Sequence, residues 1–213
     1  MKTLIAVPCM DTVPAQFAQS LATLDRVGEC TVAFQIGSLI YTSRNDLATR
    51  AMKMDADFVF WLDSDMIFSP NTLARLMKRM EHADIVSGLY FRRVMPYTPV
   101  IFDELTIDDK GCHWTDYTEK PIPSDLFEVG GCGFGCVLMR TDALFDVQAR
   151  FGNMFAPIGN VGEDLSYCWR ARECGYKIFC DPTIPLGHVG HTVITQGFFE
   201  SFKKAKEARH GVD

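Results

Sequence analysis

The sequence predicts an α/β fold with a mostly parallel central sheet, helices on both faces and a small antiparallel insertion. Up to residue 90, strand-like apolar runs alternate with helical patterns, which predicts right-handed crossovers and a parallel sheet. The run Phe58–Leu62 is continuously apolar and rich in aromatic residues, as in a buried strand. The segment Phe91–Glu128 breaks the alternation and holds four prolines, which favours an insertion over a separate domain.

In the first half of the chain we expect strands and helices in strict alternation. The expected strands are Thr3–Cys9, Thr31–Ile36, Phe58–Asp63 and Asp84–Tyr90. The expected helices are Asp11–Leu24, Arg44–Met54 and the segment after Ser69-Pro70. Ser43, with Asp46 three residues on, is placed to cap the second helix, and Ser69 followed by proline is a favoured start for the third.

The second half is less regular. A short strand at Val100–Phe102 and a hairpin around Asp108–Gly111 are expected inside the insertion. A strand over Glu128–Arg140 follows, with four glycines that let its backbone approach a ligand or another strand closely. The remaining expected elements are a helix at Ala143–Val147, a helix after Gly162-Glu163-Asp164, a strand at Tyr176–Cys180 and a final amphipathic helix with Phe198, Phe199, Phe202 and Ala205.

Composition limits the class of protein. The chain has 213 residues, enough for one well-cored domain, and 47% of them are hydrophobic. Its net charge of −6 gives no overall positive field, which counts against a DNA- or RNA-binding protein. No apolar run approaches the ~20 residues of a transmembrane helix. Eight cysteines without a Cys-x-x-Cys pair indicate free thiols in a reducing cytoplasm.

Two carboxylates, Asp63 and Asp65, end the central apolar run. Residues i and i+2 of a strand point to one side, so both carboxylates are expected to face one space. Two like charges together are costly unless a cation compensates them, and Mg²⁺ or Mn²⁺ commonly joins carboxylates to substrate phosphates. We therefore expect a metal–diphosphate site at the carboxyl end of this strand. The alternative is a local role in a cap or turn.

Other polar side chains have both structural and functional interpretations. Glu163 and Asp164 begin a helix, where acids complement the helix dipole; one of them could instead be a general base for a hydroxyl nucleophile. His188 and His191 flank glycines after a strand and are either structural or ligating. Arg44 is either a solvated helix charge or a contact to a bound nucleotide.

Taken in order, four motifs resemble those of GT-A glycosyltransferases, especially the family-2-like group of small phage and bacterial enzymes. These are Asp63-Ser64-Asp65, the Gly130–Gly135 loop, Gly162-Glu163-Asp164 and Gly187-His188-Val189. The resemblance runs from the first strand to His188. It implies a single GT-A, Rossmann-like domain over residues 1–213, with a nucleotide-binding half at about 1–90 and an acceptor half at about 91–213.

The resemblance also implies residue roles. Asp65 would ligate the metal, Asp63 would lie near the ribose or the metal's water shell, and His188 would complete the site, with His191 as the fallback. Asp164, beside Glu163, would activate the acceptor. The implied nucleotide-binding residues are Pro8, Asp11, Arg44, Asp63 and Ser64.

The implied reaction is Mn²⁺- or Mg²⁺-dependent transfer of a sugar from a UDP- or GDP-type donor to a hydroxyl acceptor on a glycan, a protein or a modified DNA base. A carboxylate base opposite the leaving group favours inversion, although related folds perform both outcomes. The insertion is expected to line the acceptor side, with Tyr90, Arg92, Arg93 and Trp114 as candidate contacts.

Two other classes remain open. A sugar-nucleotide nucleotidyltransferase would share the layout, but would need a glycine- and lysine-rich loop where Pro8–Thr12 stands. A non-catalytic nucleotide-sugar- or glycan-binding relative would keep the fold and need no base.

Overall fold

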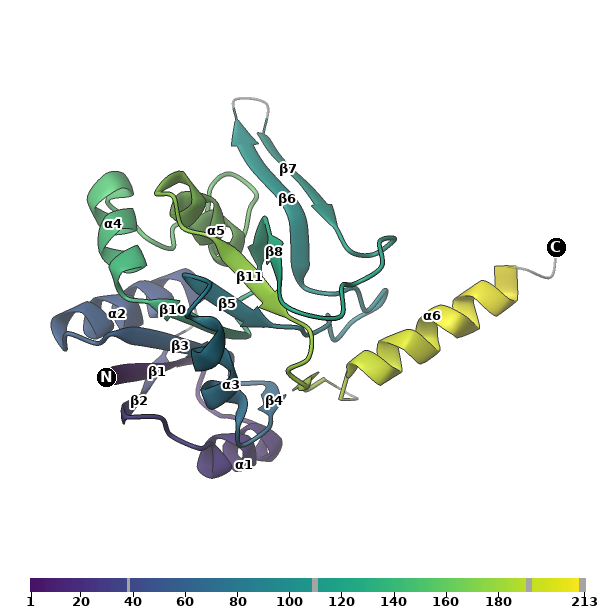
Figure 1. Ribbon diagram of the computed structural model, residues 1–213, viewed down its shortest axis with the longest axis horizontal. Helices are drawn as coiled ribbons and strands as arrows, with labels where there is room; N and C mark the ends of the chain where they lie inside the picture. The colour runs from purple at the N-terminus through teal and green to yellow at the C-terminus, as the bar shows by residue number, and fades with distance from the viewer. Residues whose placement is uncertain (38, 109–110, 191–192, 211–213) are drawn as a thin grey trace.

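The protein is described by a computed structural model that covers residues 1–37, 39–108, 111–190 and 193–210. Within these residues a seven-stranded sheet forms the centre, in the order β2-β1-β3-β10-β5-β11-β8 (Figure 1). Its strands are β1 (Lys2–Cys9), β2 (Glu29–Ile36), β3 (Phe58–Leu62), β5 (Ile85–Gly88), β8 (Phe127–Val129), β10 (Cys136–Arg140) and β11 (Ile178–Asp181).

The predicted α/β class and the mostly parallel sheet are confirmed. β2, β1 and β3 pair in parallel, as do β5 and β11. β10 lies antiparallel between β3 and β5, and β8 is an antiparallel edge strand beside β11. β3 and β5 are therefore not neighbours, because β10, which comes later in the chain, inserts between them.

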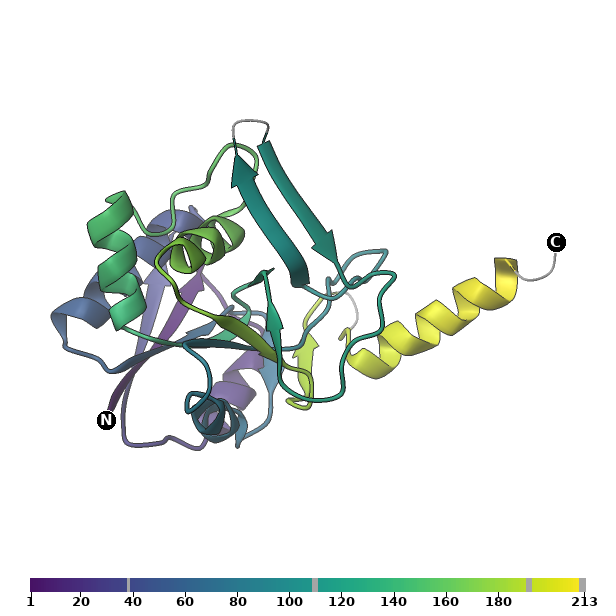
Figure 2. The ribbon, with the colours of Figure 1, turned by 45° about the horizontal axis from the view of Figure 1, so that its top comes forward.

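Helices cover both faces of the sheet (Figures 1 and 2). One face carries α2 (Ile40–Lys53), α4 (Asp142–Phe151) and α5 (Glu163–Glu173), and the other carries α1 (Ala15–Thr23) and α3 (Thr72–Arg79). Strand alternation explains the two cores: in β1, Leu4 and Ala6 join the first core, whereas Ile5 and Val7 join the second. A strand that is covered on both sides must be apolar throughout, as β3 is.

Two small antiparallel sheets complete the fold, and the predicted antiparallel insertion is confirmed. The first is formed by β6 (Ile101–Asp108), β7 (Gly111–Asp116) and β9 (Gly131–Cys132), and the second by β4 (Met66–Phe68) and β12 (Leu186–His188). The last helix, α6 (Gln196–His210), projects away from the body (Figures 1 and 2). No helix in the described ranges has the length and apolarity needed to cross a bilayer. Each of the eight cysteines is a free thiol.

The single strand expected over Glu128–Arg140 is wrong. This stretch forms β8, β9 and β10, which belong to two different sheets. The change of sheet occurs at Gly130, whose N–H donates to the carbonyl oxygen of Phe102, 2.7 Å away, next to β6. A Cβ at Gly130 would lie 2.8 Å from the carbonyl oxygen of Asp103, so only glycine permits this crossing.

Three helix starts also differ from expectation. α1 begins at Ala15, because Pro14 disfavours helical dihedrals in the residue before it. α2 begins at Ile40, so Ser43 is a buried residue inside the helix and does not cap it with Asp46. α3 begins at Thr72, with a backbone hydrogen bond of 3.1 Å from Thr72 to Ser69 in the turn before it.

Candidate active site

A cavity of about 410 Å³ opens where β1, β2 and β3 reach their carboxyl ends. Because β2 and β3 lie on opposite sides of β1, this is where the strand order reverses, the usual ligand position in such sheets. Among the described residues, the lining includes every predicted catalytic, nucleotide-binding and metal-ligating residue except Asp11, which is exposed beyond the end of β1. The lining residues are Pro8, Cys9, Met10, Gly37, Ile40, Arg44, Asp63, Ser64, Asp65, Arg93, Glu163, Asp164 and His188.

The two aspartates occupy a turn and not a strand. β3 ends at Leu62, and the next three residues turn the chain into β4, with a hydrogen bond of 3.0 Å from the Asp63 N–H to the Gly135 carbonyl. Both carboxylates face one cavity, as expected, but the turn after β3 places them there and not the alternation of side chains along a strand. Asp63 contacts Arg44, whereas Asp65 contacts His188, although both line the same cavity.

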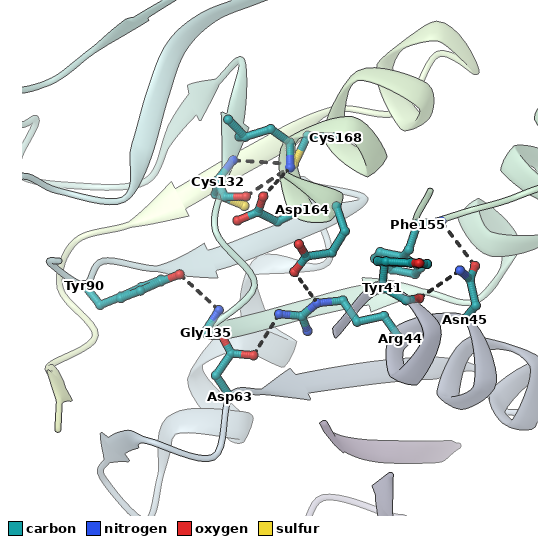
Figure 3. Close-up of polar contacts among 12 residues, drawn as sticks. Tyr41, Arg44, Asn45, Asp63, Tyr90, Cys132, Gly135, Phe155, Asp164 and Cys168 are labelled. Atoms are coloured by element: carbon teal, nitrogen blue, oxygen red, sulfur yellow. Dashed lines mark hydrogen bonds and ion pairs between the residues drawn. The ribbon is translucent and has the colours of Figure 1, made fainter. Parts of the chain in front are cut away.

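Arg44 joins the two acidic motifs. Its Nη2 donates to Asp63 Oδ1 at 2.8 Å (Figure 3), and its Nε donates to Glu163 Oε1 at 3.1 Å. Only 2% of the side chain is exposed, so the interpretation as a solvated helix charge is wrong. The guanidinium carbon lies 5.7 Å from the ring centre of Trp61 and 5.3 Å from that of Phe134.

Charge keeps this buried arginine ionised. Burial alone would lower its pKa, but the carboxylates of Asp63, Glu163 and Asp164 raise the pKa of Arg44 above its ordinary value. Within the described chain, Nη1 of Arg44 is buried without a hydrogen-bond partner. The arginine thus fixes the distance between the turn after β3 and the start of α5.

Asp164 and Glu163 are adjacent but differ in environment. Glu163 is held by Arg44, while Asp164 Oδ1 accepts from the Leu165 N–H at 2.7 Å. Burial, followed by the negative charge of Glu163, raises the pKa of Asp164 to about 6. A carboxyl group with a pKa moved toward neutrality suits a general base, whereas a paired carboxylate does not.

Asp65 and His188 meet because β12 pairs with β4. His188 lies opposite Met66 in this pair, and its Nε2 is 3.4 Å from Asp65 Oδ2. Its Nδ1 lies 2.8 Å from the carbonyl oxygen of Phe91; since a carbonyl can only accept, Nδ1 carries a proton. Arg93 pairs with the same Asp65 oxygen from the other side. Although burial opposes ionisation, the contacts with His188 and Arg93 hold the pKa of Asp65 below its usual range.

The residues around Asp65 fit a divalent cation. The Phe91 carbonyl fixes the His188 tautomer that leaves Nε2 toward Asp65, the usual support of a ligating histidine. Asp63 is engaged by Arg44, and among the described residues no three His, Cys, Asp or Glu side chains gather around one point. Asp65 and His188 can supply two ligands, and substrate phosphates and water would supply the rest. His191 lies outside the described residues.

Sequence reasoning missed Cys9, Met10, Gly37 and Ile40 in the cavity lining. Gly37 follows β2 at the same edge of the sheet as Asp63, so the parallel layout alone could have indicated it. Cys9 ends β1, Met10 follows it and Ile40 begins α2, and no charge or motif marks them.

The candidate acceptor residues separate in the structure. Arg93 lines the cavity, and Tyr90 is buried with its ring edge-on to His188. Arg92 is exposed, and Trp114 is half exposed on β7; neither lines the cavity. Their acceptor role stays a prediction.

The glycine cluster serves protein contacts. A Cβ at Gly133 would lie 2.1 Å from the Tyr90 hydroxyl oxygen, and one at Gly135 would lie 2.7 Å from the Tyr90 ring. The Gly135 N–H donates to this hydroxyl at 3.2 Å (Figure 3). Neither glycine lines the cavity, so the close approach that they permit is to Tyr90.

A second cavity, of about 480 Å³, is lined in part by Ile67 and Gly187. In the β4–β12 pair these residues face away from His188, because side chains alternate along a strand. None of the described residues that line it is charged, so it offers no cation or carboxylate for a diphosphate–metal group.

The chain is similar to known proteins in part of its sequence and in its fold. Residues 43–147 match the model of glycosyl transferase family 2, a range that holds Arg44 and the Asp63–Asp65 turn and ends before Glu163. This match supports glycosyltransferase activity. No curated protein matches the sequence.

Two solved structures share the fold. A197 from STIV has 18% identity and a TM-score of 0.66, over 92% of this chain and 94% of that one. GalNAc-T7, solved with UDP, GalNAc and Mn²⁺, has 11% identity and a TM-score of 0.59, over 89% of this chain and 44% of that one. Together with the family 2 match, these structures identify the fold of the chain as that of the family-2-like GT-A glycosyltransferases.

Proposed function

We propose that this protein is a metal-dependent glycosyltransferase that moves a sugar from a nucleoside-diphosphate sugar to a hydroxyl acceptor, with inversion at the sugar carbon. The observation that carries the proposal is the convergence of the Asp63–Asp65 turn, Glu163-Asp164 and His188 on one cavity. Its volume of about 410 Å³ falls within the usual range for small-ligand sites.

In this proposal Asp65 and His188 hold Mn²⁺ or Mg²⁺ against the donor diphosphate. The cation, when bound, would stabilise the negative charge that develops on the leaving diphosphate. The GalNAc-T7 structure, solved with UDP and Mn²⁺, supports a UDP-type donor and manganese. Ser64 and Asp63, in the same turn, would contact the nucleotide.

The nucleotide base would lie at the end of β1. Pro8 lines the cavity there, beside Met10 and Ile40, whose side chains are 66% and 39% exposed. Exposed apolar groups at the edge of a polar cavity suit the face of a flat heterocyclic ring. Asp11, exposed just beyond, would bind polar groups at the rim of that ring.

Asp164 would accept the proton of the attacking hydroxyl. Its pKa of about 6 leaves it ionised at neutral pH and still basic enough for this transfer. A base on one face of the sugar and a leaving group on the other favour a single inverting displacement. Residues at about 1–90 would then bind the nucleotide, and residues at about 91–213 would bind the acceptor, which could belong to a glycan, a protein or a modified DNA base.

A thermal-shift panel of UDP- and GDP-sugars, with and without Mn²⁺, tests the proposal. One donor should raise the melting temperature only when Mn²⁺ is present. At a hundred times its dissociation constant, a ligand adds about 2.7 kcal/mol, or roughly 5–10 °C for a chain of this size. The same donor should then be hydrolysed slowly, or transferred to an acceptor.

The control variants are Asp65→Asn, which should lose the Mn²⁺-dependent shift, and Asp164→Asn, which should keep it and lose turnover. If no donor shifts the melting temperature with Mn²⁺, the proposed function is wrong. Full turnover in Asp164→Asn would show that this carboxylate is not the base.

A further inference from the structure

Arg93 occupies an oxygen that the proposed cation needs. Its Nη1 contacts Asp65 Oδ2, the same atom that faces His188 Nε2. The guanidinium of Arg93 places a positive charge beside Asp65. If a metal displaces Arg93 from Asp65, the Arg93 side chain remains at the cavity wall, because Arg93 is one of the residues that line the cavity.

The segment that bears Arg93 has fixed ends and an exposed middle. Phe91 is 1% exposed, and the Arg92 N–H donates to the Thr98 carbonyl at 2.9 Å. Between these anchors, a turn closed from the Tyr97 N–H to the Val94 carbonyl places Val94 and Met95 in solvent, 64% and 69% exposed. The Arg93 side chain is 51% exposed, so it can change partner without disturbing the core.

Simultaneous binding of the guanidinium and a divalent cation to one carboxylate oxygen is unfavourable, because the two positive charges would be in contact. A metal on Asp65 and His188 therefore releases Arg93. The planar guanidinium, freed at the wall of the same cavity, matches the paired oxygens of a diphosphate.

We propose that Arg93 exchanges partners during donor binding: it holds Asp65 before the cation arrives and then binds the leaving diphosphate. This inference rests on the proposed function, and it makes Arg93 a specificity-determining residue for diphosphate donors. It predicts opposite effects of one substitution on two ligands.

The test compares Arg93→Ala with Arg92→Ala, which removes the same charge from the neighbouring exposed residue that does not line the cavity. Free Mn²⁺, measured by electron paramagnetic resonance without nucleotide, should show roughly three- to tenfold tighter binding to Arg93→Ala than to the wild type. Inorganic pyrophosphate, titrated calorimetrically with excess Mg²⁺, should bind roughly tenfold more weakly to Arg93→Ala. Arg92→Ala should leave both affinities within about twofold of wild type, because exposed charges contribute little.

Arg93→Lys serves as a second variant and should fall between wild type and Arg93→Ala for both ligands, since lysine keeps the charge and loses the planar fork. The proposed exchange is overturned if Arg93→Ala and Arg92→Ala bind Mn²⁺ equally while Asp65→Asn has lost Mn²⁺ binding. In that case the metal site exists, but Arg93 does not compete with the metal for Asp65. If Asp65→Asn binds Mn²⁺ as the wild type does, the metal-dependent function itself fails. Unchanged pyrophosphate binding in Arg93→Ala overturns the diphosphate role.

Discussion

Two neighbouring carboxylates at the start of α5 have opposite effects on the stability of the fold. Glu163 shares the buried guanidinium of Arg44, so its charge is compensated in the fold. Asp164 lies half-buried beside that charge, and its pKa rises from 3.8 to about 6. Because the folded pKa exceeds the unfolded one, the contribution of Asp164 to stability is fully present below about pH 4 and is lost as the pH rises through 6.

Asp164→Asn should therefore stabilise the protein at pH 8 and remove turnover. A shift of about two pKa units corresponds to about 3 kcal/mol, an upper value for the gain over wild type at pH 8, and the gain should vanish at pH 4. Urea unfolding of both proteins at the two pH values measures this difference. In the wild type, kcat/KM should fall about tenfold per pH unit below pH 6, because the protonated carboxyl cannot accept a proton.

Glu163→Gln is the matched control for this pair. It removes the ion pair with Arg44 and should destabilise the protein at pH 8 by roughly 2 kcal/mol, a typical value for a hydrogen bond to a charged group. A gain in stability for Glu163→Gln, or an equal effect of Asp164→Asn at pH 4 and pH 8, would contradict the division of roles between the two carboxylates.

At the scale of elements, the stretch before β10 positions the turn after β3. The Gly135 carbonyl accepts from the Asp63 N–H, and the Gly135 N–H donates to the Tyr90 hydroxyl, so one glycine links β3, β10 and the segment after β5. The close contact with Tyr90 leaves no room for a side chain at this position.

Gly135→Ala should destabilise the fold by about 1–3 kcal/mol, the usual cost of overpacking, and should weaken donor binding by displacing Asp63. Urea unfolding and the donor thermal shift measure the two effects. The control is Gly197→Ala, where the nearest atom to a new Cβ is 3.9 Å away; it should be neutral or slightly stabilising in α6. Equal stabilities of the two variants would contradict this role for Gly135.

The same element shows where sequence reasoning stops. Local patterns predicted β1, β2, β3 and β5, whose apolar runs alternate with helical patterns along the chain, and a hairpin around Asp108–Gly111, where β6 and β7 pair. They could not show that residues 136–140 insert between β3 and β5, because these pairings join segments about fifty to eighty residues apart and depend on tertiary contacts. The apolar sequence of β10 does not indicate which strands it pairs with.

The sequence indicated most of the charged residues of the site, but not which of them contact one another. Asp63, Asp65 and Glu163 were marked by their acidic motifs, whereas the partner of each was set by the turn after β3 and by the burial of Arg44. On a helix of mixed polarity, the sequence alone does not show whether an arginine is buried or exposed, because this depends on how the helix packs on the sheet. His188 lies in the cavity because the β4–β12 pair brings it to Asp65; its role as a metal ligand stays a prediction.

At the scale of the whole molecule, α6 is linked to the cavity through one segment. Phe199 stacks on Phe91 with ring centres 4.7 Å apart, and Phe198 and Phe202 contact Tyr97 edge-on at 5.1 Å each. The carbonyl of Phe91 orients His188. The base of a helix that otherwise projects from the body (Figure 2) thus holds both ends of the segment that carries Arg93.

Phe199→Ala should loosen residues 91–97 more than the central sheet. Loss of the stacked ring removes the packing that fixes Phe91, so amide hydrogen exchange of Arg92 and Tyr97, whose N–H groups bond within the segment, should accelerate. Amides of β1 and β3, which lie in the sheet, should change little, and Mn²⁺ binding should weaken as the Phe91 carbonyl loses its fixed position beside His188. Lys204→Ala, exposed on the same helix, should alter neither property. Uniformly faster exchange in β1, β3 and residues 91–97 would mean that α6 stabilises the fold as a whole and does not act through this segment on the site.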